Sequence, residues 1–335
     1  MIPTMERILL SGGAGKLGRV LVPALLARGY ALTLLVRDAG SAREKLGFLP
    51  AKNFQLLQAD LSRQEGVAAA INRAGTQDLA INAAGSVDYS AGADAMMEGN
   101  GKTAGNFAGI SRALGVRRLV HVSSTSVYGK VAYGPIDETA PTNPAGAYGK
   151  SKLEAENAVG KSGLETAILL RPCAIYGSTF WSQYEKFAVD LIEGKARLIG
   201  DGNNRVALVH ASDVASAVVL ALGKRNASGA YNIASGEQVT QKGLYEIASR
   251  IMGVPAPAKS APKQLAYLAA SVDGLRARFI SGRRTIFPEE ISAIAEDRAF
   301  SIEKARRELE WEPKVKMEKG MAEMLAARGK KWQRA

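Results

Sequence analysis

The sequence is poor in cysteine and histidine: its 335 residues include one cysteine, Cys173, and two histidines. One cysteine cannot form an intrachain disulfide, and so few thiol and imidazole groups argue against a zinc site, so we expect no metal. No apolar run approaches the roughly 18 residues of a membrane-spanning helix, so we expect no stable membrane insertion. The apolar stretch before the first glycines is too short for a signal peptide, which predicts a cytoplasmic protein.

Aromatic residues are also scarce, at 6%, whereas basic residues outnumber acidic ones by 44 to 32, a net charge of +12. A surplus of positive charge suits an anionic ligand or a nucleic acid. Because the basic residues are scattered with few aromatics among them, we favour a solvated basic surface and expect no nucleic-acid partner. The densest basic groups are Arg276, Arg278, Arg283 and Arg284, and Arg328, Lys330, Lys331 and Arg334.

Apolar strand patterns alternate with helical patterns along the first half of the chain, which is 47% hydrophobic overall. This alternation predicts an α/β fold, a Rossmann-type doubly wound parallel sheet with helices on both faces. The strand patterns cover residues 7–11, 31–36, 54–58, 79–82, 119–123 and 166–170, and the helical patterns cover residues 19–28, 64–74, 96–114 and 148–161.

The pattern changes after Pro172, where loops lengthen and prolines cluster. A helix and a strand pattern between residues 210 and 235 indicate a return to the sheet. We therefore predict a dinucleotide-binding domain of residues 1–172, to which residues 210–235 return. Residues 173–209 and 236–335 then form a smaller, discontinuous C-terminal substrate lobe.

Gly12, Gly15 and Gly18 form a G-x-x-G-x-x-G turn between the first strand pattern and the first helix pattern. Small residues here let the backbone approach a pyrophosphate, and the helix N-terminus supplies amide donors and a positive dipole. We favour dinucleotide binding over a merely structural turn, because the glycines lie within a strand–helix–strand unit of the expected length.

The end of the second strand pattern bears on the choice of cofactor. An acidic side chain there accepts the ribose hydroxyls of NAD, whereas an arginine pairs with the 2′-phosphate of NADP. Arg37 and Asp38 offer one of each, so both cofactors stay open. Lys16, Arg37 and Arg43 favour NADP.

Tyr148 and Lys152 are four residues apart, which places both on one face of the helix predicted over residues 148–161. An ammonium beside a phenol favours the phenolate, so we expect Lys152 to lower the pKa of Tyr148. Such a tyrosine can exchange a proton with a substrate carbonyl or alcohol. Ser124, after an apolar strand, could donate a hydrogen bond to the same oxygen.

With these motifs in order, the chain resembles the extended short-chain dehydrogenases/reductases, the NAD-dependent epimerase/dehydratase group. The resemblance runs nearly end to end. The matching segments are SGGAGKLG (11–18), Asp60-Leu61, NAAG (82–85), a helix with Asn100, Thr103 and Asn106, HVSSTSVYG (121–129), YGKSKLEAE (148–156), RPCAIYG (171–177), VHASDVASA (209–217), YNIASGE (231–237) and KARRELEWEP (304–313).

The resemblance implies roles for these residues. Tyr148 would be the acid/base, Lys152 would hold the nicotinamide ribose, and Ser124 falls on the family's active-site Ser/Thr position. Relatives with LVRD at the second strand have an apolar residue at the acid position, which is Val36 here, and this agrees with NADP. The remaining cofactor contacts implied by the glycine loop and the matching motifs are Gly12, Gly15, Lys16, Leu17, Gly18, Arg37, Asp60, Leu61, Ala83, Ala84, Gly85, Asn100, Ser123 and Pro172. We also expect a homodimer.

Within the family, relatives that act on nucleotide sugars usually carry Asn in the R-P-x-N-x-Y-G stretch, where this chain has Ala174. They tend to have an arginine at the position of Val206, with Arg205 one residue away, and an R-P-G-D pattern that residues 281–294 lack. The chain is more similar to the dihydroflavonol-reductase or steroid-dehydrogenase-like branch. The apolar segment 264–272 could line a substrate pocket or touch a membrane, although we favour a core helix of the lobe.

These features leave three functional hypotheses. The first is an NAD(P)(H)-dependent oxidoreductase that acts on a small-molecule ketone, aldehyde or secondary alcohol. The second is a nucleotide-sugar epimerase or dehydratase that reduces and reoxidises its cofactor within one turnover. The third is a non-catalytic dinucleotide-binding or sensor protein, against which the intact set of Ser124, Tyr148 and Lys152 argues.

Overall fold

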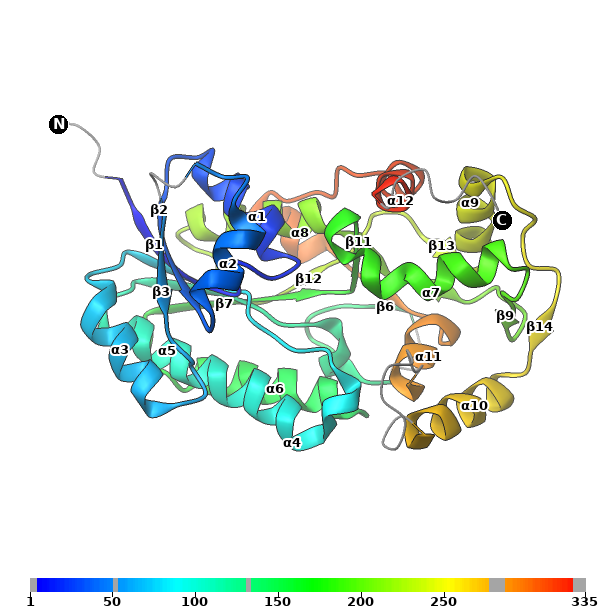
Figure 1. Ribbon diagram of the computed structural model, residues 1–335, viewed down its shortest axis with the longest axis horizontal. Helices are drawn as coiled ribbons and strands as arrows, with labels where there is room; N and C mark the ends of the chain where they lie inside the picture. The colour runs from blue at the N-terminus through cyan, green and yellow to red at the C-terminus, as the bar shows by residue number, and fades with distance from the viewer. Residues whose placement is uncertain (1–4, 51–53, 131–133, 277–286, 328–335) are drawn as a thin grey trace.

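The computed structural model describes residues 5–50, 54–130, 134–276 and 287–327. Its centre is a seven-stranded sheet in which all strands are parallel, in the order β12-β7-β5-β4-β1-β2-β3 (Figure 1). The chain winds outward from β1 in one direction and then from β4 in the other, which confirms the predicted doubly wound sheet. The strands are β1 (Arg7–Ser11), β2 (Ala31–Val36), β3 (Phe54–Gln58), β4 (Leu79–Asn82), β5 (Arg118–Val122), β7 (Thr166–Pro172) and β12 (Gly229–Ile233).

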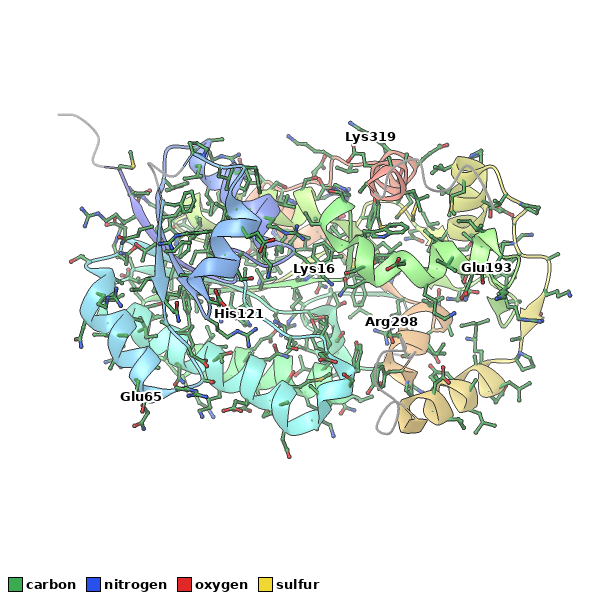
Figure 2. All side chains as sticks on the ribbon, in the orientation of Figure 1. Lys16, Glu65, His121, Glu193, Arg298 and Lys319 are labelled. Atoms are coloured by element: carbon green, nitrogen blue, oxygen red, sulfur yellow. The ribbon has the colours of Figure 1, made fainter. Side chains whose placement is uncertain are left out.

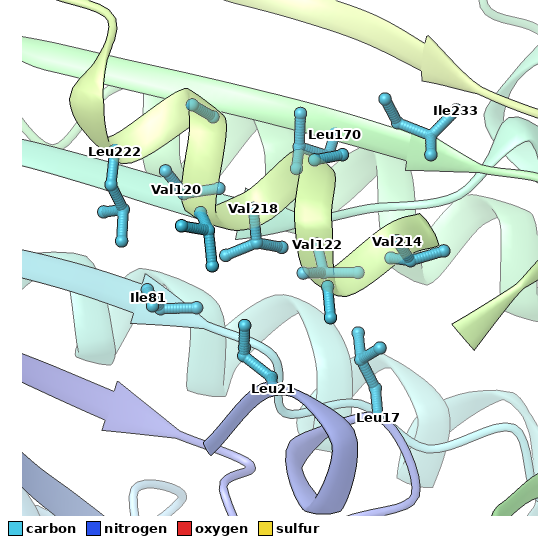
Figure 3. Packing of buried hydrophobic residues seen from close by; sticks show 14 of the residues in the cluster. Leu17, Leu21, Ile81, Val120, Val122, Leu170, Val214, Val218, Leu222 and Ile233 are labelled. Carbon is cyan, nitrogen blue, oxygen red and sulfur yellow. The ribbon is translucent and has the colours of Figure 1, made fainter. Parts of the chain in front are cut away.

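Helices cover both faces of this sheet. Helices α1 (Gly18–Leu26) and α8 (Ala211–Gly223) lie on one face, and α3 (Gln64–Ala74), α5 (Thr103–Ala113) and α6 (Ala147–Gly160) lie on the other (Figure 1). Figure 3 shows Leu21 of α1, Val218 of α8 and Val120 of β5 within one apolar cluster. Because the central strands are buried on both faces, their sequences are continuously apolar instead of alternating.

The helix predicted over residues 96–114 consists of three pieces. The α-helix α4 (Gly92–Met96) continues into a π-helical segment, η3 (Met97–Lys102), and then into α5. A short 3₁₀ turn, η2 (Tyr89–Ala91), precedes them. A π segment widens the helix locally, a change that often occurs at functional sites, and here it contains the buried Asn100.

Helices α7 (Trp181–Ile192), α9 (Gln241–Met252) and α12 (Met317–Ala326) form a second, smaller core with the end of β8 (Ala174–Tyr176). They lie together beyond the carboxyl ends of the main sheet (Figure 1). The strand pairs here are short. They are β8 with β11 (Leu208–His210), β9 (Leu198–Ile199) with β14 (Ser260–Ala261), β10 (Arg205–Val206) with β13 (Val239–Thr240), and β6 (Pro135–Ile136) with β15 (Ala299–Phe300).

Helix α2 (Ala39–Leu46) also packs with the sheet. Helix α8 and the edge strand β12 belong to the sheet as well, as expected for residues 210–235. The exact domain boundaries stay a prediction. The other elements are α10 (Lys263–Arg276), α11 (Pro288–Ala295), the 3₁₀ turns η4 (Thr125–Tyr128) and η5 (Ser178–Phe180), and the π segment η6 (Ala305–Leu309).

Helix α10 corrects one expectation. We favoured a core helix over residues 264–272, but Leu265 and Leu268 are 58% and 61% exposed, and Ala270 alone of that segment is fully buried. The apolar pattern of residues 264–272 predicted a helix correctly, but it could not show that only a narrow face of the helix packs against other residues. Among the described residues, no helix is long and apolar enough to cross a membrane. The basic residues 278, 283, 284, 328, 330, 331 and 334 lie outside the described residues.

Candidate active site

The glycine loop packs directly on the chain that follows β4. Gly12 has φ +77°, and a Cβ there would come within 2.5 Å of the backbone of Ala83 and Ala84. A Cβ on Gly18 would lie 2.2 Å from the carbonyl oxygen of Gly12. The loop is closed by a 2.9 Å hydrogen bond from the Gly15 amide to the same oxygen. Only glycine fits these positions, so the structure brings the predicted residues into one cradle of backbone.

This cradle suits a pyrophosphate. Helix α1 begins at Gly18 with Leu17 as its N-cap, and no side chain caps it. The amides of Arg19 and Val20 already donate to Gly15 O and Leu17 O, so an anion here would be attracted by the positive end of the helix dipole and by the loop backbone before Gly18. Asn82 fixes the adjoining strand end, because its Oδ1 accepts hydrogen bonds from Ser11 Oγ at 2.7 Å and from the Ala84 amide at 3.2 Å. Ser11 was not predicted as a site residue, since its role depends on a contact between two strands.

Arg37 and Asp38 follow β2, and the choice between NAD and NADP depended on their charges. Asp38 is the N-cap of α2, and its Oδ1 accepts a 2.8 Å hydrogen bond from the Ser41 amide. Arg37 is exposed and lies within electrostatic reach of Asp60. Val36 is buried and apolar. The acidic group of the pair thus has a structural task, while the basic group faces solvent.

Asp60 and Leu61 follow β3 at the same end of the sheet. The amide and hydroxyl of Ser62 donate hydrogen bonds to Asp60 Oδ1 at 3.0 and 2.9 Å, which lowers the pKa of Asp60. The carbonyl oxygen of Leu61 accepts a 2.7 Å bond from Asn106 Nδ2. The segment is therefore fixed and its carboxylate is ionised, as an adenine-side contact would need, although that role stays a prediction.

Tyr148 and Ser124 meet at the centre of the site. Ser124 follows β5 and caps η4, with its Oγ accepting a 3.1 Å hydrogen bond from the Ser126 amide. Burial raises the pKa of the Tyr148 phenol, and the nearby Ser124 hydroxyl lowers it by less, so the net pKa of Tyr148 is raised. The ring of Tyr148 lies 6.2 Å from that of Tyr89, which in turn lies 5.6 Å from that of Phe287.

Lys152 lies deeper, with its side chain buried. Its Nζ donates a 2.7 Å hydrogen bond to the Val122 carbonyl at the end of β5. A Cβ on Gly85 would lie 3.5 Å from this Nζ, so Lys152 reaches the loop after β4. Burial lowers the pKa of Lys152 to about 8, and the charge of Glu156 partly opposes this. Figure 2 shows that His121 and Lys16 also lie in this sheet-bearing half.

One electrostatic expectation is wrong. We expected Lys152 to lower the pKa of Tyr148, yet that pKa is raised. The physical reason is that both groups are withdrawn from water, and the ammonium is committed to the carbonyl of Val122. The tyrosine therefore keeps its proton at neutral pH.

Asn100 ties the π segment to the catalytic helix. Its Oδ1 accepts a 2.7 Å bond from the Ser86 amide, and its Nδ2 donates to Ser86 O and to Ser151 Oγ, both at 2.9 Å. Ser151 Oγ in turn donates to the Tyr148 carbonyl at 2.8 Å. Asn100 thus holds the loop after β4 against α6, and its predicted cofactor contact stays a prediction.

Two features beside the site were missed from the sequence. Glu156 and Arg171 form a buried ion pair, to which Ser123 donates a further hydrogen bond. His121 is buried, and neither ring nitrogen has a hydrogen-bond partner among the described residues. Burial and the charge of Lys152 hold the pKa of His121 well below its usual value, so the ring is neutral. The matching segments 121–129, 148–156 and 171–177 contain these residues, but their sequences give no sign of the contacts.

Pro172 ends β7, and Cys173 after it is buried, which raises the pKa of its thiol. Within the described part of the chain, no group of three or more histidine, cysteine or acidic side chains is placed to hold a metal. The geometry therefore offers a dinucleotide cradle and a Ser–Tyr–Lys set, joined at the carboxyl ends of the parallel strands.

Comparisons with known proteins agree with this arrangement. The NAD dependent epimerase/dehydratase family matches residues 8–234. The chain is 26% identical to a 2-alkyl-3-oxoalkanoate reductase of Stenotrophomonas maltophilia, over 96% of this chain and 99% of that protein. It is 28% identical to a UDP-glucose 4-epimerase of Corynebacterium glutamicum, over 77% and 84%. The fold matches the Bordetella bronchiseptica enzyme WbmG, in complex with NAD and UDP, with a TM-score of 0.75, 20% identity and coverage of 98% and 96%.

Proposed function

The chain belongs to the NAD-dependent epimerase/dehydratase family, and from this we propose that it is an NADP(H)-dependent oxidoreductase that reduces a ketone or aldehyde. The reverse reaction would oxidise a secondary alcohol. The observation that carries the proposal is the placement of the Ser124 hydroxyl beside the Tyr148 phenol, whose pKa it lowers, with Lys152 one helical turn further along α6. The non-catalytic alternative has no use for this set.

The chain's own residues would divide the work as follows. The bound cofactor supplies or accepts the hydride. Tyr148 donates its proton to the carbonyl oxygen while Ser124 donates a hydrogen bond to it, so one hydride and one proton convert the carbonyl to an alcohol. A phenol that keeps its proton suits the reductive direction. Lys152 would hold the ribose and place a positive charge behind the phenol.

NADP(H) is the cofactor that the end of β2 favours. Val36 offers no carboxylate to a ribose hydroxyl, and the carboxylate of Asp38 already caps α2. Arg37 is exposed and can pair with a 2′-phosphate in a charge-assisted contact. The WbmG structure contains NAD, so the choice of NADP(H) belongs to this proposal.

The substrate we propose is a carbonyl compound without a nucleotide. Ala174 on β8 is exposed and cannot hydrogen-bond through its side chain. Arg205, a candidate for a diphosphate, is already paired with Asp297 at 2.6 Å. The rings of Tyr89 and Phe287 give the surroundings of Tyr148 an apolar character. Val206 carries less weight than the sequence suggested, because it is buried in the lobe core.

Nucleotide-sugar epimerisation is the alternative, which UDP-glucose 4-epimerase relatives keep open. A panel of ketones, sterols and nucleotide sugars separates the two, with NADPH absorbance as the readout. We expect net NADPH loss with a ketone or aldehyde, and none with Tyr148→Phe. A thermal shift with uridine, thymidine or guanosine diphosphate in the presence of NADP, together with sugar interconversion at constant NADPH, would overturn the proposal. The homodimer, the cytoplasmic location and the absence of a nucleic-acid partner stay predictions.

A further inference from the structure

The catalytic helix carries a third polar side chain that the proposed reaction does not use. Tyr148, Lys152 and Glu156 follow one another at four-residue intervals on one face of α6. Glu156 is 5% exposed and pairs with Arg171, which is 7% exposed. Buried ion pairs often contribute little to stability, because the cost of removing both charges from water offsets their attraction. This pair therefore calls for a role other than stability.

The carboxylate of Glu156 joins two separate segments. Its Oε1 accepts hydrogen bonds from Ser123 Oγ at 2.5 Å and from Arg171 Nε at 2.9 Å. Its Oε2 accepts one from Arg171 Nη2 at 2.7 Å. Arg171 thus binds the carboxylate with two parallel bonds, a geometry that fixes orientation as well as distance.

Each partner of Glu156 is the neighbour of a predicted site residue. Ser123 precedes Ser124 and is itself a predicted cofactor contact, and Arg171 precedes Pro172. The arrangement is braced from behind, because Arg171 Nη1 donates to the Tyr128 hydroxyl at 2.9 Å and that hydroxyl donates to Asn232 Oδ1 at 2.8 Å. The network therefore connects α6, the end of β5, the end of β7 and the edge strand β12, without itself touching a reacting atom.

Glu156 also supplies the negative charge next to Lys152. The groups that face Lys152 are Val122 O and the neutral His121 from β5, Glu156 from its own helix, and the loop at Gly85. Among these described groups, Glu156 is the carboxylate. It opposes the loss of the Lys152 proton that burial favours.

We propose that Glu156 is a positioning residue of this active site, which holds the strand end bearing Ser124 in register with the helix bearing Tyr148 and Lys152 and keeps the Lys152 ammonium charged. The inference rests on the proposed function for the importance of Lys152. Its geometric part, the clamp on Ser123 and Arg171, stands on the hydrogen bonds alone.

Glu156→Gln tests the proposal, with Glu154→Gln as the matched control. Glu154 lies on the same helix two residues away and is exposed, so the control makes the same change of charge without breaking the clamp. The side-chain amide that Glu156→Gln introduces would also present N–H groups to a guanidinium that can only donate. Hydrogen exchange measured by mass spectrometry should therefore speed up at least about tenfold over residues 123–128 in Glu156→Gln and stay unchanged in Glu154→Gln.

The second readout is the pH dependence of NADPH affinity, which a merely structural role would not move. In the wild type, affinity should fall as pH rises through the range near 8 where Lys152 loses its proton. His121 titrates well below this range and Tyr148 above it. Lys152→Met should abolish this fall in affinity, which we call the step, and would thereby assign it to Lys152. In Glu156→Gln the step should move about one pH unit lower, and in Glu154→Gln it should stay in place.

The outcomes separate the two claims. If the affinity of the wild type has no pH step, or if Lys152→Met leaves the step in place, the proposed role of Lys152 is wrong. Hydrogen exchange over residues 123–128 then remains the test of the hydrogen bonds from Ser123 and Arg171 to Glu156. If the step exists but Glu156→Gln moves neither it nor the exchange of residues 123–128, the inference is overturned. Should Glu156→Gln fail to fold, the double variant Glu156→Gln/Arg171→Met removes both charges and is expected to fold with the step still shifted.

Discussion

The half of the molecule built on the sheet and the lobe beyond it are held together differently. In the sheet half, strands of four to seven residues pair in parallel, and the glycine loop touches the chain after β4 so closely that no side chain fits. In the lobe, the paired strands are two or three residues long, and α10 exposes two leucines. In the proposed function, the chemistry common to many substrates belongs to the sheet half, and recognition of one substrate belongs to the lobe with the shorter strands.

The largest expected effect is the loss of turnover on changing Tyr148, the proposed acid/base of the sheet half. Tyr148→Phe keeps the ring and removes the proton donor, so turnover should fall roughly 100- to 10,000-fold while NADPH affinity changes little. The control is Tyr245→Phe, a lobe tyrosine that packs on Phe187. Steady-state rates and cofactor titrations check both. Near wild-type turnover in Tyr148→Phe would refute the assignment of the acid/base.

A pair of leucine substitutions measures the difference in packing directly. Leu21 is fully buried between α1 and the sheet, and Leu268 on α10 is 61% exposed. Leu21→Ala should lower the free energy of unfolding by about 2–5 kcal/mol, whereas Leu268→Ala should change it by less than about 0.5 kcal/mol. Denaturant titrations decide the matter. Comparable losses would mean that α10 is covered in solution, and that the contrast between the two regions is smaller than the exposed areas suggest.

Substitution of Arg37 tests whether the sheet half selects NADP(H) over NAD(H). Arg37→Ala should weaken NADP(H) binding by about 1.5–3 kcal/mol, roughly ten- to a hundredfold, because a charge-assisted contact is lost. NAD(H) binding should be nearly unchanged. Lys45→Ala, at an exposed position on α2, is the control for the loss of one positive charge nearby. Calorimetric titration with both cofactors provides the answer, and a wild type that prefers NAD(H) would rule out Arg37 as the selecting residue.

The glycine cradle gives the smallest of these effects. Gly18→Ala would place a Cβ 2.2 Å from the Gly12 carbonyl oxygen, so we expect a loss of about 1–3 kcal/mol in stability and weaker NADPH binding. Gly109→Ala on α5 meets nothing within 4 Å and should stabilise the helix by roughly 0.5–1 kcal/mol. Thermal unfolding with and without NADPH compares the two. Equal behaviour would show that the loop relaxes easily.

The same contrast explains what the sequence predicted. The strands at Ala31–Val36 and Leu79–Asn82 and the helix at Gln64–Ala74 were predicted to the residue, because buried strands leave short apolar runs and amphipathic helices leave periodic patterns. The glycine loop and the Tyr148–Lys152 spacing were visible for the same reason: local geometry demands particular residues at fixed intervals.

What the sequence did not predict depends on contacts between distant segments. The ion pair of Glu156 with Arg171 joins a helix to a strand, and the π segment at Asn100 widens to reach Ser86 and Ser151. The N-cap that Asp38 forms on α2 was not predicted, because Asp38 was considered as a ribose ligand. The exposure of α10 follows from which face packs on α11, a fact of tertiary structure that periodicity cannot supply.

The most direct test of the central claim follows the hydride itself. NADPH deuterated at the transferable position of the nicotinamide C4 is incubated with the protein and a carbonyl compound that consumes NADPH in the panel. We expect one deuterium in the alcohol product for each NADP⁺ formed, and in Tyr148→Phe we expect neither deuterated alcohol nor NADP⁺. Conversion of a nucleotide sugar to its epimer, with no accumulation of oxidised cofactor, would contradict it.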